Sequence, residues 1–239
     1  MTRTRLSSLA FTLTLALAAT ALPAAAQVAP SISLAEQMRG MLGKPAAGAT
    51  AAAPAFAPAP PVASGGGMGA FNAPIVAAGP AQVRQSATEL AQRFPAQHRA
   101  AMTKAYEESF TFWQKLETQL GLAPNDVAAA VAAFIAGNYA AFMQQHVADA
   151  DFKSLVLQMQ GLLASNPAFM QSAPAAKRAM FEQLAMVGTF MVVYREHLNR
   201  QPSPGEEVNF RNAAKANLEA ALGLAVERLQ IGPQGLVVR

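Results

Sequence analysis

Three histidines, His98, His146 and His197, are the side chains of this chain best suited to bind a metal ion or to move a proton near neutral pH. They fall on three different predicted helices. No HExxH or comparable spacing places two of them on one helix face. We therefore predict exposed or capping histidines and no metal site.

Two pairs of adjacent carboxylates, Glu107/Glu108 and Glu206/Glu207, could in principle perform acid/base chemistry. Neighbours on a helix point about 100° apart, so neither pair can share one site. We interpret both as surface residues, the second pair also placing negative charge at a helix start. Asp149 and Asp151 are interpreted as caps of a helix that begins at Phe152.

Motifs of nucleophilic and phosphate chemistry are missing from the sequence. The chain contains no cysteine, which excludes thiol catalysis, and it contains no GxSxG motif. The glycine-rich stretch SGGGMG, residues 64–69, has neither a preceding strand nor the Lys-Ser/Thr ending of a P-loop. The sequence thus predicts a protein that is not an enzyme, with no catalytic residue and no cofactor.

The N-terminal residues have the order of a secretory signal peptide. Arg3 and Arg5 precede an apolar run from Leu9 to Leu22, and small residues follow up to Ala26. We predict a signal peptide at 1–26 with cleavage before Gln27, and a periplasmic or secreted protein. The alternative is an uncleaved anchor, but the run is short of the ~20 residues that span a bilayer. We expect no stable membrane insertion after cleavage.

Residues 27–44 contain a short amphipathic helix. Its apolar side chains recur at helical spacing, Ser33 and Glu36 have the spacing of a capping box, and Gly43 ends the pattern. A helix of this length is marginal alone in water, where about 12 to 15 residues are needed. We predict docking on its own domain, on a second copy or on a separate envelope protein, with disorder as the alternative. The predicted contact residues are Leu34, Met38, Met41 and Leu42.

Residues 45–81 mix Ala, Pro and Gly without sustained periodicity, which predicts a disordered linker. Residues 82–239 then have helical periodicity in every long segment. We predict an all-α fold, a single helical bundle of about five to six helices that ends in a short extended tail. The predicted domain helices begin after Phe94-Pro95, at Asn125 or Asp126, near 150, near 175 and at Ser203-Pro204, where Glu206 is the expected capping carboxylate. Gly121 is placed to end the first of these helices.

The segment from Val127 to Met143 carries no charge and is rich in alanine. It is either a membrane span or a helix buried in the domain. Small residues form a ridge through Ala133 and Gly137 that suits close helix packing, and no Lys/Arg cluster flanks the segment. We therefore predict a buried central helix, in which Asn138 and Tyr139 hydrogen-bond to a neighbouring helix or reach the surface rather than bind a ligand.

Several stretches in this order carry a family resemblance: GLAPNDVAAAVAAFIAGNYAAF, DADFKSLVLQMQGLLASNPAF, EQLAMVGTFMVV and ERLQIGPQGLVV. The chain resembles an exported bacterial family known as a domain of unknown function, over roughly Gln82 to Val238. The shared features are small and apolar residues and a closing Gly235-Leu236. The resemblance implies an all-helical exported domain and no catalytic residue.

Charge and composition bear on the expected partners and the class of function. The formal net charge of +4 falls to +2 once Arg3 and Arg5 leave with the signal peptide, and no basic stripe is present, so we expect no nucleic-acid partner. Our leading hypothesis is a non-enzymatic binding or structural module of the cell envelope. The alternatives are a carrier of an apolar ligand, which a large apolar cavity would favour, and an enzyme without a recognisable motif, which converging buried polar side chains would favour.

Overall fold

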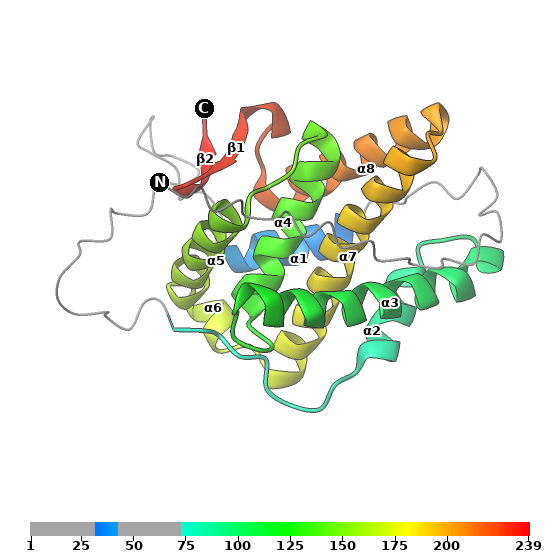
Figure 1. Ribbon diagram of the computed structural model, residues 1–239. Helices are drawn as coiled ribbons and strands as arrows, with labels where there is room; N and C mark the ends of the chain where they lie inside the picture. The colour runs from blue at the N-terminus through cyan, green and yellow to red at the C-terminus, as the bar shows by residue number, and fades with distance from the viewer. Residues whose placement is uncertain (1–31, 43–72) are drawn as a thin grey trace, which may run out of the picture.

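The structure, a computed structural model, describes residues 32–42 and 73–239 (Figure 1). The predicted signal peptide, residues 1–26, and residues 45–72 of the predicted linker lie outside the described residues. The described chain is mostly α-helical, and it ends in a two-stranded antiparallel sheet.

Eight α-helices are present in the described residues, against the five to six that the sequence predicts. The two additional helices are α2, which precedes Phe94-Pro95, and the single turn α6, which follows the N-cap Asn166. The α-helices are α1 (Ile32–Leu42), α2 (Val83–Ala91), α3 (Ala96–Leu120), α4 (Val127–Met143), α5 (Asp149–Ala164), α6 (Pro167–Met170), α7 (Pro174–Arg200) and α8 (Pro204–Leu222).

Helix α4 forms the centre of the domain, as predicted. Every residue from Val127 to Ala141 is buried, and α5, α7 and α8 pack around the helix (Figure 1). The ridge through Ala133 and Gly137 packs on α7 at Gly188. Among the described helices, none is long and apolar enough to cross a membrane.

One of the two predicted polar residues of this helix, Asn138, has a hydrogen-bond partner on a neighbouring helix. The side chain of Asn138 donates to the carbonyl oxygen of Phe134 at 2.8 Å and accepts from the side chain of Asn217 on α8, also at 2.8 Å. These two bonds satisfy a fully buried amide in the middle of the core.

Two predicted helix boundaries are confirmed by their caps. Gly121 ends α3 in the left-handed conformation with φ of 66°, which glycine adopts without steric cost. Asp126 is the N-cap of α4, and its Oδ1 accepts a hydrogen bond from the backbone N–H of Ala128 at 3.0 Å.

Two other capping predictions, for Asp149/Asp151 and for Glu206, are wrong, although Ser203 and Pro204 take the predicted N-cap and first helical positions of α8. Helix α5 begins at Asp149 itself, so Asp149 and Asp151 lie in its first turn and do not cap a helix at Phe152. Ser203 is the N-cap position of α8 but makes no side-chain capping bond, and Glu206 accepts a hydrogen bond from the Tyr194 hydroxyl at 3.0 Å instead. Negative charge in the first helical turn still favours both helix starts.

The predicted extended tail is a β-hairpin of β1 (Leu229–Gly232) and β2 (Gly235–Val238), preceded by the 3-10 turn η2 (Val226–Arg228). It packs on α5 and is drawn in red in Figure 1. The Gln158 amide of α5 accepts from the Leu236 N–H at 2.8 Å and donates to the Leu236 carbonyl at 2.9 Å. Gln158 thereby bonds β2 as a neighbouring strand would.

The predicted linker extends too far toward the C-terminus. Ala77 is 3% exposed, and its N–H donates to the carbonyl oxygen of Asn125 at 2.9 Å. The N–H of Val127 donates to the carbonyl oxygen of Ile75 at 2.9 Å. Residues 75–77 therefore belong to the domain, whose predicted start is Gln82.

Candidate functional site

The three histidines do not converge in the structure. His98 is buried, 8% exposed, in the first turn of α3, which corrects the prediction of an exposed or capping side chain. His146 is exposed, and His197 lies in the last turn of α7 with its ring 5.8 Å from that of Tyr194. In the described part of the chain, no three His, Cys, Asp or Glu side chains are grouped so that they could hold a metal ion.

The carboxylate pairs also take separate roles. Glu108 forms an i,i+4 ion pair with Lys104 at 3.8 Å on the outside of α3. Glu206 is bonded to Tyr194, whereas Glu207 lines a surface cleft. The structure thus brings neither pair into one acid/base site.

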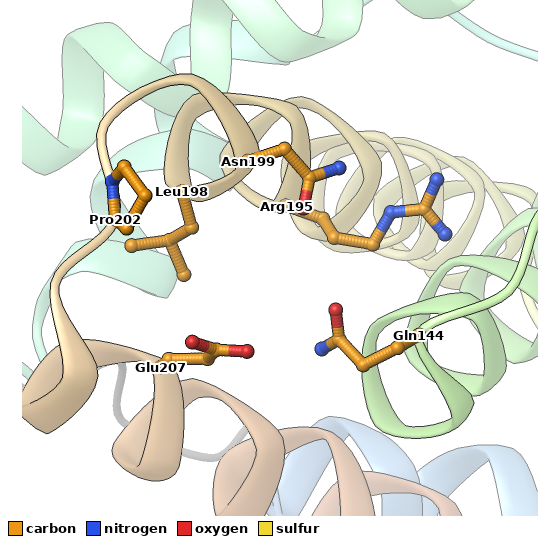
Figure 2. Close-up of a pocket in the computed structure, with 6 residues that line it drawn as sticks. All are labelled: Gln144, Arg195, Leu198, Asn199, Pro202 and Glu207. Carbon is orange, nitrogen blue, oxygen red and sulfur yellow. The ribbon is translucent and has the colours of Figure 1, made fainter.

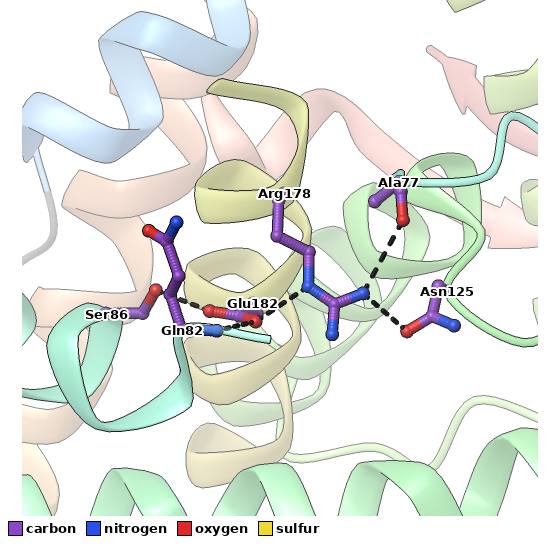
Figure 3. A network of polar contacts seen from close by, with 6 residues as sticks. All are labelled: Ala77, Gln82, Ser86, Asn125, Arg178 and Glu182. Atoms are coloured by element: carbon purple, nitrogen blue, oxygen red, sulfur yellow. Dashed lines mark hydrogen bonds and ion pairs between the residues drawn. The ribbon is translucent and has the colours of Figure 1, made fainter. Parts of the chain in front are cut away.

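A buried polar network that the sequence did not indicate lies at the start of α7 (Figure 3). Arg178 Nε donates to Glu182 Oε1 at 2.8 Å, and Glu182 is fully buried. The same carboxylate accepts from the backbone N–H of Gln82 at 2.9 Å and from the Ser86 hydroxyl at 2.7 Å. Three donors therefore compensate the burial of one negative charge.

The other side of the Arg178 guanidinium bonds the loop between α3 and α4. Its Nη1 donates to the Asn125 side-chain oxygen at 2.9 Å and to the Ala77 carbonyl at 3.5 Å, as the dashed lines of Figure 3 show. Asn125 has a positive φ of 61°, a conformation that asparagine tolerates better than most residues. The network thus joins residues 77 and 82 to α2, to α7 and to the loop before α4.

Two further buried carboxylates flank this network. Asp126 accepts from the Ile75 N–H at 3.1 Å and from the Gln160 amide at 2.7 Å, and burial raises its pKa. Glu117, 6% exposed, accepts from the Asn125 N–H at 3.2 Å, and burial raises its pKa to about 7. Burial dominates in both because it disfavours the charged form.

Perturbed carboxylates that converge in this way would suit an acid/base site. Here, however, each carboxylate already accepts hydrogen bonds from the protein, and Glu182 and Asp126 are 0% and 1% exposed. Glu182 fixes Gln82 and Ser86 to α7, and Asp126 fixes Ile75 to the start of α4. We therefore interpret the network as structural, because it connects residues 75–86 to α7 and to the loop before α4.

A small cleft lies at the opposite end of α4 (Figure 2). Its volume is about 200 Å³, and four of its six lining residues are polar or charged. Arg195 Nη1 already donates to the carbonyl oxygens of Ala140 and Gln145 at the C-terminal end of α4. The lining residues are Gln144, Arg195, Leu198, Asn199, Pro202 and Glu207.

The face of α8 that α1 covers, here called the α1 site, is the remaining candidate. Helix α1 packs mainly on α8 and also touches α5 and α7. Leu34 and Met38 are 2% and 0% exposed and belong to the single hydrophobic core. Of the three docking places predicted for this helix, the structure shows its own domain; the side chains of Met41 and Leu42 lie outside the described ones.

A polar contact completes the α1 site. Arg39, in the last turn of α1, donates from Nη2 to the backbone carbonyl oxygen of Glu219 at 3.4 Å. The same guanidinium lies against Gly223, the C-cap of α8. Together, the apolar and the polar contacts hold α1 on the last turns of α8.

Comparison with known proteins places these features in a family. The sequence model of the family of unknown function DUF6683 matches residues 4–239. The chain belongs to DUF6683. The match is longer than the resemblance over Gln82 to Val238, because it also includes most of the predicted signal peptide and all of the linker. No curated protein and no solved structure matches the chain significantly.

For this member of DUF6683, one sequence signal could have revealed the buried network. Arg178 and Glu182 are oppositely charged, four residues apart, and border the apolar face of α7 that contains Phe181. Such a pair is usually assigned to the surface. The sequence could not show that the Ser86 hydroxyl and the Gln82 N–H both donate to the Glu182 carboxylate.

Proposed function

We propose that this protein is an exported, non-enzymatic binding module of the cell envelope, and that the α1 site is its binding surface. One observation carries the proposal. The isolated amphipathic helix α1, which residues 43–72 separate from the rest of the described domain, lies on α8 with Leu34 and Met38 buried. The α1 site is thus a surface that accepts an amphipathic helix.

The shortness of α1 supports reversible docking of this helix on α8. An isolated helix of 11 residues is marginal in water, so α1 owes its order to the domain. The connection through residues 43–72 makes docking intramolecular and gives α1 a high effective concentration. A partner helix with the same spacing of apolar residues displaces α1 only if it binds more tightly or is present at a high local concentration.

Export is supported by the N-terminal sequence. Cleavage before Gln27 would leave five residues ahead of Ile32, so α1 would be the first helix of the mature protein. We expect the intact mass of the exported protein to correspond to a start at Gln27. A full-length chain in a carbonate-resistant membrane pellet would contradict this part of the proposal.

The two alternatives find less support in the described residues. The cleft of about 200 Å³ is smaller than the roughly 300–1,000 Å³ of typical ligand pockets, and its lining is not predominantly apolar. The converging carboxylates that would favour an enzyme are fully engaged in holding the N-terminal segment of the domain.

The test compares the protein starting at Gln27 with one starting at residue 73, which lacks α1 but keeps residues 75–77. We expect the shorter protein to bind a synthetic peptide of residues 27–44, and the Leu34→Asp/Met38→Asp peptide not to bind. Light scattering and crosslinking in the exporting cell then show whether a second copy or another protein occupies the exposed site. Absence of peptide binding, together with identical crosslinks in both proteins, would overturn the proposal.

A further inference from the structure

We propose that Arg39 determines which helix the α1 site accepts, and that the site selects an amphipathic helix with an arginine directly after its second apolar anchor. In α1 the anchors are Leu34 and Met38, four residues apart, and Arg39 follows the second. This inference rests on the proposed function, because it names the chemistry of the helix that the site binds.

The first observation is the place where the guanidinium lies. Arg39 Nη2 is 3.4 Å from the carbonyl oxygen of Glu219, which also accepts the N–H of Gly223 at 2.9 Å. This carbonyl belongs to the last turn of α8, where a helix carries negative partial charge. A cation is therefore favoured at this end of the site, and a carboxylate is disfavoured.

The second observation is the shape of the surface beneath the guanidinium. A Cβ atom on Gly223 would lie 2.2 Å from Arg39 Nη2 and 2.9 Å from its Cζ. The flat guanidinium thus lies in space that any other residue at this position would fill. Arginine suits such a place better than lysine, because its planar group combines charge with stacking on a surface.

The domain supplies a matched reference for Gly223. Gly121 ends α3 with φ of 66°, close to the 70° of Gly223, but nothing lies within 4 Å of a Cβ built on it. Both glycines satisfy the same left-handed cap. Only Gly223 also makes room for a side chain of another helix.

The carboxylate of Glu219 does not compete for the arginine. Its Oε1 lies 3.4 Å from Lys215 Nζ, and Lys215 also bonds Glu227. The group that meets Arg39 is therefore the carbonyl end of α8. A helix carrying an acidic residue at the position of Arg39 would place a negative charge against the negative partial charge of this helix end and lose the bond.

The experiment uses the full mature chain with one introduced thiol. Ala35 is fully buried in the α1 site, and the chain has no cysteine, so Ala35→Cys gives a single thiol that reacts only when α1 leaves the site. Gly40→Cys, on the exposed side of α1, controls for the intrinsic reaction rate. The rate with a thiol reagent then reports the undocked fraction.

In this background we expect Arg39→Gln to raise the labelling rate about two- to five-fold, the range for a charge at a helix end. Gly223→Ala should raise it more than Gly121→Ala, which has the same backbone strain. Combined with Gly223→Ala, Arg39→Gln should add nothing further, whereas its effect should persist alongside Gly121→Ala. Independent effects of Arg39→Gln and Gly223→Ala would overturn the inference.

Added peptides separate the inference from the proposed function. A peptide of residues 27–44 should compete with α1 and raise the labelling rate, and its Arg39→Glu version should compete several-fold less well. Equal competition by both peptides would overturn the role of Arg39 while the binding function stands. If neither peptide competes but the coupling between positions 39 and 223 is observed, the proposed function fails and the selection of α1 by Arg39 stands.

Discussion

Gly137 of α4 and Gly188 of α7 lie in backbone contact where the two central helices cross. A Cβ atom on Gly137 would lie 2.2 Å from the carbonyl oxygen of Gly188, and one on Gly188 would lie 2.4 Å from the carbonyl group of Ala133. Side-chain atoms do not approach a backbone this closely. Glycine at both positions is therefore what allows α7 to cover the centre of α4.

Replacing Gly137 by leucine should disrupt this crossing. The obstructing atoms are backbone atoms of α7, which cannot rotate away as a side chain would. We expect a loss of at least about 1–3 kcal/mol in the free energy of unfolding, the usual range for added bulk in a full core. Urea denaturation of the mature protein measures it.

Gly161→Ala is the matched control for this substitution. Gly161 also lies inside a helix, α5, but nothing is within 4 Å of a Cβ built on it. We expect Gly161→Ala to raise the free energy of unfolding by about 0.5–1 kcal/mol, because alanine favours the helix more than glycine does. An unfolding midpoint that Gly137→Leu leaves unchanged would show that the crossing is not close.

The sequence predicted the central features of the fold because they depend on local patterns. The small ridge of α4, the left-handed Gly121 and the cap Asp126 each follow from residue type and spacing. The capping prediction for Glu206 is wrong for a physical reason. Its carboxylate could bond the backbone of its own helix or a tertiary partner, and in the structure it bonds the Tyr194 hydroxyl of α7.

The candidate sites were less predictable, because their contacts join residues distant in sequence. The helix around Leu34 and Met38 could be read from periodicity, but not its docking on the end of α8. The segment around Ala77 looked like linker because its bonds are made by backbone groups, which carry no sequence pattern. Residue type and spacing likewise do not mark Gly223 as a contact of Arg39.

Breaking the buried ion pair should detach the N-terminal segment of the domain. Glu182→Gln leaves the Arg178 guanidinium without its counter-charge in a buried site. We expect a loss of about 3–5 kcal/mol, as found when one partner of a buried pair is removed. Hydrogen exchange at the Ala77 amide should also become faster, because Arg178 holds the Ala77 carbonyl.

The exposed pair of Lys104 and Glu108 provides the comparison. It has the same i,i+4 spacing at 3.8 Å, but the Lys104 side chain is 72% exposed. Glu108→Gln should change stability by no more than about 0.5 kcal/mol. Equal losses of stability in Glu182→Gln and Glu108→Gln would mean that burial of Glu182 does not help to hold the N-terminal segment of the domain.

The closing glycine of the hairpin should be required for its docking on α5. Gly235 has φ of 81°, and a Cβ there would lie 2.6 Å from Gln158 Oε1. Gly235→Ala should therefore displace the Gln158 amide that bonds Leu236. Because it also strains the backbone, it should lower the free energy of unfolding by about 1–3 kcal/mol. Gly232→Ala, across the turn, meets nothing within 4 Å, and calorimetry should show a much smaller change.

Glu117 should make the stability of the domain depend on pH. Burial raises its pKa from 4.5 in the unfolded chain to about 7 in the folded one. Between these values the folded state binds the additional proton, so the free energy of unfolding falls as pH rises from about 4.5 to 7 and levels off above. Asp126, whose pKa is also raised, contributes in the same direction.

Glu117→Gln isolates this contribution, because the amide keeps an oxygen that can accept the Asn125 N–H but carries no charge. Since one pKa unit corresponds to about 1.4 kcal/mol, we expect the substitution to stabilise the protein by about 1–3 kcal/mol at pH 7.5. At pH 4.5 the difference should be small, because Glu117 is then largely protonated in the folded state. Urea denaturation of both proteins between pH 4.5 and 8 measures the difference, and the same difference at every pH would rule out titration of Glu117 as its cause.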